Sequence, residues 1–185
     1  EAMLINSLPN NEESYKKELG VSTLAGDESY SLNEKKWFRP TLDCNGIIGG
    51  YTGEGAKTVI PSKASMKISM RLVSNQDPEK ISKSFKNYIN SLCPEGIKLD
   101  INEHSSAPPF LCDPSSNGIE MAMKALKETF GTAVYLQGEG GSIPIVSEIQ
   151  KQLGMDVVLM GLNFPDDNIH SPNERFFLDN YQKGI

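Results

Sequence analysis

The chain has 185 residues, 38% of them hydrophobic, and a formal net charge of -6. This composition is typical of a soluble globular protein with a core of its own, and it excludes a largely disordered chain. The acidic balance without a basic run argues against nucleic-acid binding, and the apolar stretches are too short to span a membrane.

The first residues of the chain and its cysteines indicate the cellular compartment. Residues 1–20 lack the charged-then-apolar order of a signal peptide, and the first residue is not Met, so we expect a piece cut from a longer protein. An odd number of widely spaced cysteines fits a reducing compartment better than a disulfide framework. We therefore predict a cytoplasmic protein with buried thiols at Cys44, Cys93 and Cys112.

The first predicted elements are a polar helix and a glycine-rich strand region. Residues 10–19 have Asn residues ahead of acidic positions and are followed by Gly20, which is typical of a short, exposed helix. Between residues 37 and 60 the apolar residues are separated by several glycines. Two strand pieces joined by glycine bends fit this pattern.

A strand, a helix and a second strand are predicted next. Apolar residues alternate with polar ones over 66–72, which predicts a strand with one buried face, and Arg71 points away from that face. The Asp-Pro pair at 77–78 can begin a helix whose apolar residues keep helical spacing as far as Leu92. Residues 97–101 alternate again, so a small α+β layer with antiparallel strands is expected.

The stretch Ser-Ser-Ala-Pro-Pro at 105–109 is a proline-stiffened linker and predicts a domain boundary. Beyond it the pattern predicts a helix at 119–130, a short strand at 134–136, a helix capped by Ser142, and a strand at 157–160 that is buried on both faces. Alternating helices and strands predict the end of an α/β domain with a mainly parallel sheet.

The segment at 161–174 is the first candidate for chemistry. It follows a predicted buried strand, and open α/β proteins bind ligands in loops at the carboxyl ends of their strands. His170 lies there close in sequence to Asp166 and Asp167, and an imidazole near carboxylates suits a metal ligand or a general base. An exposed histidine in a polar turn is the alternative. The other histidine, His104, has no metal-ligand spacing to it.

The glycine-rich turn GEGGSIP at 138–144 is the second candidate. Backbone N–H groups and a helix start can receive an anion there, so Glu139 is explained if it faces a cation or a substrate ammonium. Stabilisation of the helix dipole is the alternative. GGYTGEGAKT at 49–58 is not a phosphate-binding P-loop, because Ala56 stands where that motif needs Lys. Without a G-x-S-x-G elbow or a cysteine near a histidine, serine or cysteine hydrolysis is not supported.

Three stretches together carry a resemblance: RPTLDCNGIIGGYTGEGAKTVIPSKASMKISMRLVSNQDP (39–78), GEGGSIP and DDNIHSPNE. From about Trp37 to Ile185, the chain resembles the metallopeptidase family of cytosolic nonspecific dipeptidase, carnosinase and glutamate carboxypeptidase. The resemblance implies a catalytic α/β domain that holds two metal ions, interrupted by a lid domain that mediates dimerisation. It divides this chain into a polar N-terminal segment of the lid region (1–36), a partial lid domain (37–107) and the C-terminal part of the catalytic domain (108–185).

The resemblance also implies roles for particular residues. His170 matches the last metal ligand, and Glu139 and Ser142 match residues that face the bound substrate. Arg71 resembles the arginine that pairs with the substrate carboxylate, a task that suits a guanidinium fork. Thr58 looks like a lid residue that reaches the active site of the neighbouring subunit. No catalytic residue is expected in this chain, because the general base and the other metal ligands precede this segment in the family.

The resemblance implies metal-assisted hydrolysis of short peptides by the whole protein, with two divalent ions, zinc in the first place and manganese as the alternative. One imidazole cannot hold two ions, so we expect the chain alone to be inactive and not to retain metal. The expected partners are a short peptide or dipeptide substrate and a second copy bound through the lid, without nucleic acid or membrane. An N-acyl amino acid amidohydrolase and a non-catalytic dimerisation module are the alternatives.

Overall fold

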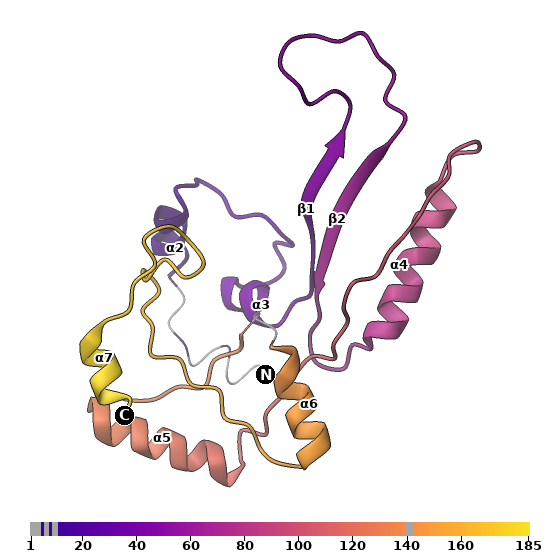
Figure 1. Cartoon of the computed structure of the whole chain (residues 1–185). Coiled ribbons are helices and arrows are strands. Elements are labelled where there is room, and N and C mark those ends of the chain that lie inside the picture. The colour runs from indigo at the N-terminus through magenta and orange to yellow at the C-terminus, as the bar shows by residue number, and fades with distance from the viewer. Residues whose placement is uncertain (1–4, 6–7, 9–10, 140–142) are drawn as a thin grey trace. The chain divides into compact units, whose positions relative to one another are not determined.

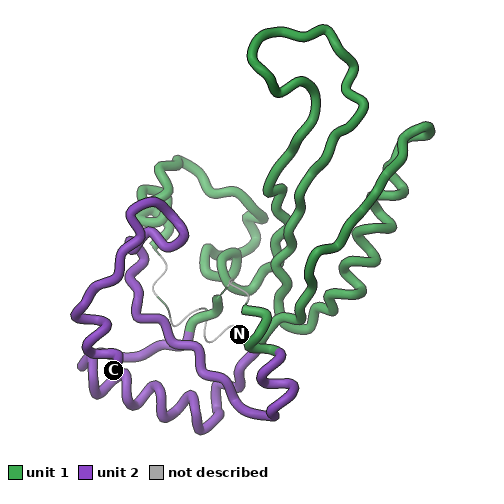
Figure 2. The backbone as a smooth tube through the Cα atoms, in the orientation of Figure 1, with its two compact units in different colours: residues 1–110, 137–147 green, residues 111–136, 148–185 purple. Residues whose placement is uncertain are grey.

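The computed structural model describes residues 5, 8, 11–139 and 143–185. The chain divides into two compact units, each made of two pieces of sequence (Figure 2). The first unit comprises Glu1–Phe110 and Gln137–Ser147, and the second comprises Leu111–Leu136 and Glu148–Ile185. Residues 137–147 return to the first unit after the chain has entered the second, so the units are not consecutive in sequence.

Two short helices lie near the N-terminus of the first unit. Helix α2 (Glu12–Leu19) begins where the side chain of Asn11 accepts a hydrogen bond from the Ser14 amide at 2.9 Å, and this confirms the predicted polar helix. Helix α3 (Leu32–Trp37), which the sequence analysis did not predict, begins with a capping box between Ser31 and Glu34. Leu32 is only 7% exposed, so α3 supplies part of the small core of this unit.

A long antiparallel hairpin dominates the first unit (Figure 1). Strand β1 (Thr41–Gly49) pairs with β2 (Ala64–Arg71), from the pair Thr41 and Arg71 to the pair Gly49 and Ala64. The predicted strand at 66–72 is thus confirmed, but the two strand pieces predicted within 37–60 are a single strand. Its register shifts between Cys44 and Gly46, so a bulge takes up the irregularity without ending the strand.

Helix α4 (Pro78–Leu92) confirms the helix predicted after the Asp-Pro pair. The side chain of Asp77 accepts hydrogen bonds from the amides of Glu79 and Lys80, at 3.0 and 3.2 Å. The capping residue, the proline in the first turn and the apolar spacing all lie within the helix segment itself. The helix therefore depends little on distant parts of the chain for its formation.

The strand predicted at 97–101 is not formed. This stretch is irregular and runs beside α4 (Figure 1). Its continuation is fixed by Glu103, which accepts hydrogen bonds from Ser82 Oγ at 2.7 Å and from Lys86 Nζ at 2.6 Å. A strand needs a backbone partner, and here the neighbouring groups are side chains of a helix.

Helices make up the regular structure of the second unit. Helix α5 (Asn117–Phe130) ends at Gly131 in the left-handed conformation (φ +68°), as predicted, and helix α7 (Leu178–Lys183) lies near the C-terminus. Helix α6 (Pro144–Leu153) begins in the first unit and ends in the second. Its predicted cap, Ser142, lies outside the described residues.

The strands predicted at 134–136 and 157–160 are not formed either. In the described residues, β1 and β2 make the only sheet, so the mainly parallel sheet is absent from the second unit. The segment predicted to be buried on both faces is partly open: Leu159 is 52% and Met160 59% exposed. A strand needs at least one neighbouring strand to pair with, and the described part of this unit supplies none.

Few side chains of the described residues are buried. The buried apolar side chains are few, and many large apolar side chains are open, with Ile60 at 93% and Ile47 at 74% exposure. The thiols predicted to be buried are not: Cys44 is exposed and the other two cysteines are half-buried. Of the helices described, none has both the length and the apolar character needed to cross a bilayer. The buried apolar residues are Leu32, Ile119 and Val146.

Candidate functional site

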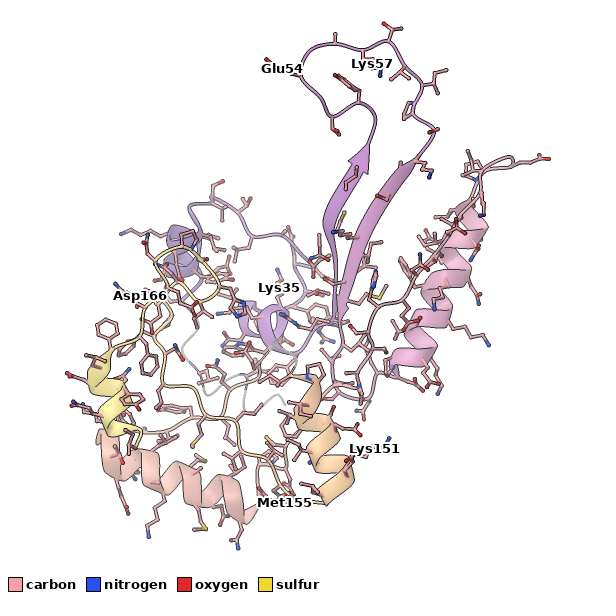
Figure 3. The ribbon with its side chains drawn as sticks, viewed as in Figure 1. Lys35, Glu54, Lys57, Lys151, Met155 and Asp166 are labelled. Atoms are coloured by element: carbon pink, nitrogen blue, oxygen red, sulfur yellow. The ribbon has the colours of Figure 1, made fainter. Side chains whose placement is uncertain are left out.

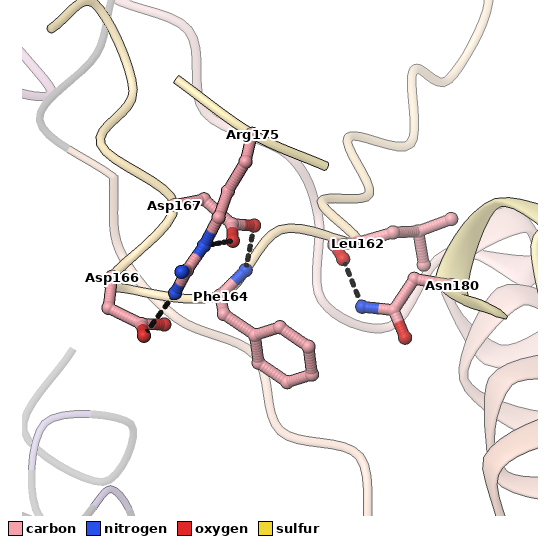
Figure 4. Close-up of polar contacts among 6 residues, drawn as sticks. All are labelled: Leu162, Phe164, Asp166, Asp167, Arg175 and Asn180. Carbon is pink, nitrogen blue, oxygen red and sulfur yellow. Dashed lines mark hydrogen bonds and ion pairs between the residues drawn. The ribbon is translucent and has the colours of Figure 1, made fainter. Parts of the chain in front are cut away.

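The loop that carries His170 is closed by a buried aspartate in the second unit (Figure 4). Asp167 is 1% exposed, and its Oδ2 accepts a hydrogen bond from the Phe164 amide at 2.7 Å. Its Oδ1 accepts one from Arg175 Nε at 3.4 Å, and its carbonyl accepts one from the Arg175 amide at 3.0 Å. One residue therefore ties together both ends of the segment from 164 to 175.

The guanidinium of Arg175 is itself held from three directions. Besides Asp167, it contacts Asp166 Oδ2 through Nη2 at 2.5 Å. Its Cζ lies 5.2 Å from the centre of the Phe177 ring, which packs edge-on against Phe164 at a centroid distance of 5.2 Å. The charge of the buried carboxylate is thus balanced by a cation whose own position is fixed.

The backbone between these ends adopts an unusual conformation. Asn168, His170 and Asn173 all have positive φ values, of 55°, 61° and 62°. A left-handed backbone costs a residue with a side chain about 1 kcal/mol, although Asn and His tolerate it better than most residues. Two turns accompany it, with the Ser171 amide 2.9 Å from the Asn168 carbonyl and the Glu174 amide 3.2 Å from the Ser171 carbonyl. Contacts outside the turns are needed to hold this shape.

His170 can serve as one ligand of a metal ion, but the described residues do not complete a metal site. Its side chain is exposed at the turn, while Asp166 and Asp167 are already engaged by Arg175. Across residues 11–139 and 143–185, no group of three His, Cys, Asp or Glu side chains comes together in a way that could hold an ion. An exposed neutral imidazole is a suitable donor for a transition metal, and further donors must come from elsewhere.

Arg71 and Thr58 lie at opposite ends of the hairpin. Arg71 is exposed and pairs with Thr41 at the start of β1, whereas Thr58 is in the connection beyond Gly49 and Ala64. With a rise of about 3.3 Å per residue, the strand from Ala64 to Arg71 is roughly 23 Å long. The two residues therefore cannot contact the same small substrate within one copy of the hairpin.

The connection between the hairpin strands is shaped by Tyr51. Its hydroxyl donates a hydrogen bond to the Glu54 carbonyl at 3.3 Å, and Lys57 Nζ lies 5.2 Å from the centre of its ring. Figure 3 shows Glu54 and Lys57 at the end of the hairpin away from α4. Thr58 follows Lys57 directly and is exposed there.

The Glu139 segment packs closely against the end of α3. A Cβ added at Gly138 would lie 2.6 Å from the Trp37 Cβ and 2.7 Å from the Phe38 ring, so only glycine fits without displacement. Glu139 is exposed beside this contact. Ser142, predicted to face the substrate, lies outside the described residues.

The predicted site residues fall in different units. Arg71, Thr58 and Glu139 belong to the first unit and His170 to the second. Their grouping in one pocket therefore stays a prediction. The part that Arg175 plays in closing the His170 loop was not predicted from the sequence. The signal for it is an Asp pair followed eight residues later by an arginine, which side-chain periodicity cannot detect in an irregular loop.

The comparisons with known proteins all point to one family of peptidases. A peptidase dimerisation domain matches residues 2–97. A Cys-Gly metallodipeptidase of Schizosaccharomyces pombe is 35% identical over 156 residues, which cover 82% of this chain and 33% of the relative. The human Beta-Ala-His dipeptidase is 27% identical over 175 residues, which cover 93% of this chain and 34% of the relative. The chain thus spans about a third of the length of these relatives.

A solved structure agrees in fold. The M20 family metallo-carboxypeptidase from Sulfolobus solfataricus superposes with a TM-score of 0.84 at 29% identity, over 98% of this chain and 41% of that chain. This confirms the predicted α/β fold class. The dimerisation-domain match alone covers more than half of the 185 residues. The chain therefore belongs to the M20 family of peptidases.

Proposed function

We propose that this chain is the later part of a metal-dependent peptidase that hydrolyses dipeptides or the C-terminal residues of short peptides through a metal-activated water. The observation that carries the proposal is the exposed imidazole of His170 on a loop closed by Asp167. Similar proteins are named metallodipeptidase and metallo-carboxypeptidase, which implies a divalent metal ion.

In this proposal His170 is one of several metal ligands in the whole protein. Two divalent ions, zinc or alternatively manganese, would act as Lewis acids and lower the pKa of a bound water. The other ligands and the general base come from residues outside this chain. The chain alone is therefore inactive and does not retain the metal.

The remaining predicted site residues would bind and orient the substrate. Arg71 offers a guanidinium fork that donates two parallel hydrogen bonds to a substrate carboxylate. Glu139 and Ser142 face the substrate from the turn at 138–144, where a carboxylate suits a substrate ammonium. Thr58 contributes from the lid of a second copy, and its distance from Arg71 along the hairpin supports that assignment.

The hairpin supports a homodimer through the lid. Within the described part of the chain, each of its two strands has one edge without a strand partner, and Ile47 and Ile48 on β1 are 74% and 60% exposed. Exposed strand edges favour pairing with another chain. We expect strand addition between copies, so a strictly monomeric elution profile at high protein concentration would count against it. We also propose a reducing compartment such as the cytoplasm, because the three cysteines are odd in number and widely spaced in the sequence.

A dimerisation module without catalysis is the second candidate, favoured by the match over residues 2–97. An N-acyl amino acid amidohydrolase is the third candidate, because Arg71 could bind the carboxylate of an N-acyl amino acid in the same way. Assays of the full-length parent on dipeptides and on acetylated amino acids separate the two enzymes. If the parent hydrolyses neither substrate class, the non-catalytic dimerisation module is the remaining candidate.

Substitution of the histidines tests the metal role. In the full-length parent, we expect His170→Ala to lower dipeptide hydrolysis by at least about 100-fold, because a ligand is lost. His104→Ala is the matched control and should leave the rate unchanged. Undiminished hydrolysis after His170→Ala, or peptidase turnover by the purified 185-residue chain, contradicts the proposal.

A further inference from the structure

Asp167 stands apart from the other acidic residues of the described chain. It is 1% exposed, the lowest value among the buried residues, and it contacts both ends of the loop that carries His170. A buried carboxylate without partners would be costly, and here the Phe164 amide and the Arg175 guanidinium satisfy it. The loop therefore closes around a fully paired charge.

The closed loop imposes the backbone shape at His170. Positive φ at Asn168, His170 and Asn173 is unfavourable for residues with side chains, and each of the three turns of the loop (164–167, 168–171 and 171–174) is closed by a single hydrogen bond between backbone groups. Pro165 and Pro172 stiffen the segment, but a proline fixes only its own φ angle. Backbone hydrogen bonds join Asp167 to Phe164 and to Arg175, at 3.1 and 3.0 Å, and the Asp167 carboxylate adds one side-chain hydrogen bond to each of the same two residues.

We propose that Asp167 is the positioning residue of His170, acting through the Phe164 amide and Arg175 to present the imidazole from one fixed loop conformation. Asp166 does not share this role. It touches only the outer side of Arg175 from a side chain that is 72% exposed. The functional importance of this positioning rests on the proposed metal role of His170, but the positioning itself can be measured without metal.

The test uses the intact 185-residue chain and its two histidines. Asp167→Asn keeps the size of the side chain and an acceptor for the Phe164 amide but removes the charge that pairs with Arg175. We expect the backbone NMR order parameter at His170 to fall from about 0.85 to below about 0.6. The Ser171 amide should exchange its hydrogen about ten-fold faster, because its turn opens. The order parameter at His104 serves as the internal reference.

Two further variants keep the test decisive. Asp166→Asn, the matched control, should leave the order of His170 unchanged. If Asp167→Asn fails to fold, Arg175→Met removes only the guanidinium side of the closure and should lower the order of His170 in the same direction. Unfolding midpoints measured for every variant separate a local opening of the loop from a general loss of fold. An unchanged order parameter at His170 in a folded Asp167→Asn chain overturns the proposal.

His170→Ala separates this inference from the proposed function. The loop should keep its order at Asn168 and Asn173 in that variant, because the closure does not use the imidazole. If the parent hydrolyses peptides normally with Ala at 170, the metal role fails and the positioning stands. If His170 stays ordered without the Asp167 charge, the positioning fails and the metal role is untouched.

Discussion

Two irregular segments of this chain each contain a carboxylate that accepts two hydrogen bonds, but one carboxylate is buried and the other lies at the surface. Asp167, 1% exposed, accepts hydrogen bonds from the Phe164 amide and the Arg175 guanidinium. Glu103, with a side chain 38% exposed, accepts hydrogen bonds from Ser82 and Lys86 on α4. The chemistry is the same in both: a carboxylate accepts one neutral and one charge-assisted hydrogen bond.

Burial makes such contacts more costly to break. Water can replace Ser82 or Lys86 as a partner of Glu103, so breaking that contact costs little. Water cannot easily reach Asp167, and each broken contact there leaves a buried polar group unpaired. The buried carboxylate can therefore impose one loop conformation, whereas the exposed one holds its segment only weakly.

Removing the buried carboxylate should have the largest effect. Asp167→Ala leaves the Phe164 amide without its acceptor, and we expect the free energy of unfolding to fall by about 2 kcal/mol in urea titrations. Asp166→Ala is the matched control, because it removes only an exposed partner of Arg175 and should cost less than about 1 kcal/mol. Equal losses in the two variants would break the contrast.

Removing the cation should have an intermediate effect. Arg175→Met keeps much of the side-chain length but takes the charge from Asp167 and Asp166 and the contact from the Phe177 ring. We expect a loss of about 1 kcal/mol, since the guanidinium is partly exposed. Arg175→Lys should recover only part of it, because an ammonium lacks the planar fork. Full recovery by Lys would show that charge alone matters.

The exposed carboxylate should reveal itself mainly through its titration. Hydrogen bonds from Lys86 and, second, from Ser82 hold the pKa of Glu103 below its usual value of 4.5. The pKa is lowered in the folded state, so the stabilising contribution is present above pH 4.5 and is lost as the pH falls through the folded pKa. In Lys86→Met, a ¹³C NMR titration should show the pKa of Glu103 closer to 4.5. An unshifted titration would show that this contact is not formed.

Salt should give the smallest effect. The Debye length falls from about 10 Å at 0.1 M to about 3 Å at 1 M ionic strength, so exposed ion pairs are screened. We expect the pKa of Glu103 to rise slightly in 1 M NaCl, while the exchange protection of the Phe164 amide on Asp167 stays the same. Loss of that protection in salt would place Asp167 in the same class as Glu103.

The sequence predicted the elements whose determinants are local. Helix α4 was predicted from its cap at Asp77 and its apolar spacing, and helix α5 from its apolar spacing and the glycine at 131, all of which lie within a few residues of the helix. The strands expected at 97–101, 134–136 and 157–160 failed because a strand is defined by its partner. The apolar pattern of these segments favours burial. The described residues of this chain do not supply the neighbouring strands that would bury them.

The candidate site divides in the same way. The composition of residues 161–174 identified the His170 loop, since Asp, Asn and Pro are typical of turns and His is a metal-binding residue. The closure by Asp167 and Arg175 was not predictable, because the pairing of two side chains across an irregular loop leaves no repeat in the sequence. The resemblance implies that Arg71 and Glu139 face one substrate; both residues belong to the first unit, and their grouping stays a prediction.

The tight fit at Gly138 has a practical consequence for labelling experiments. A spectroscopic probe attached there would collide with Trp37 and Phe38 and would report its own disturbance of the protein. Gly161 has no atom within 4 Å of the place where a side chain would begin, and it immediately precedes the segment that leads to His170. Once Cys44, Cys93 and Cys112 are replaced, a cysteine introduced at 161 can therefore carry a fluorophore or spin label. Distances from it to a second label on the hairpin would measure how the two units are arranged.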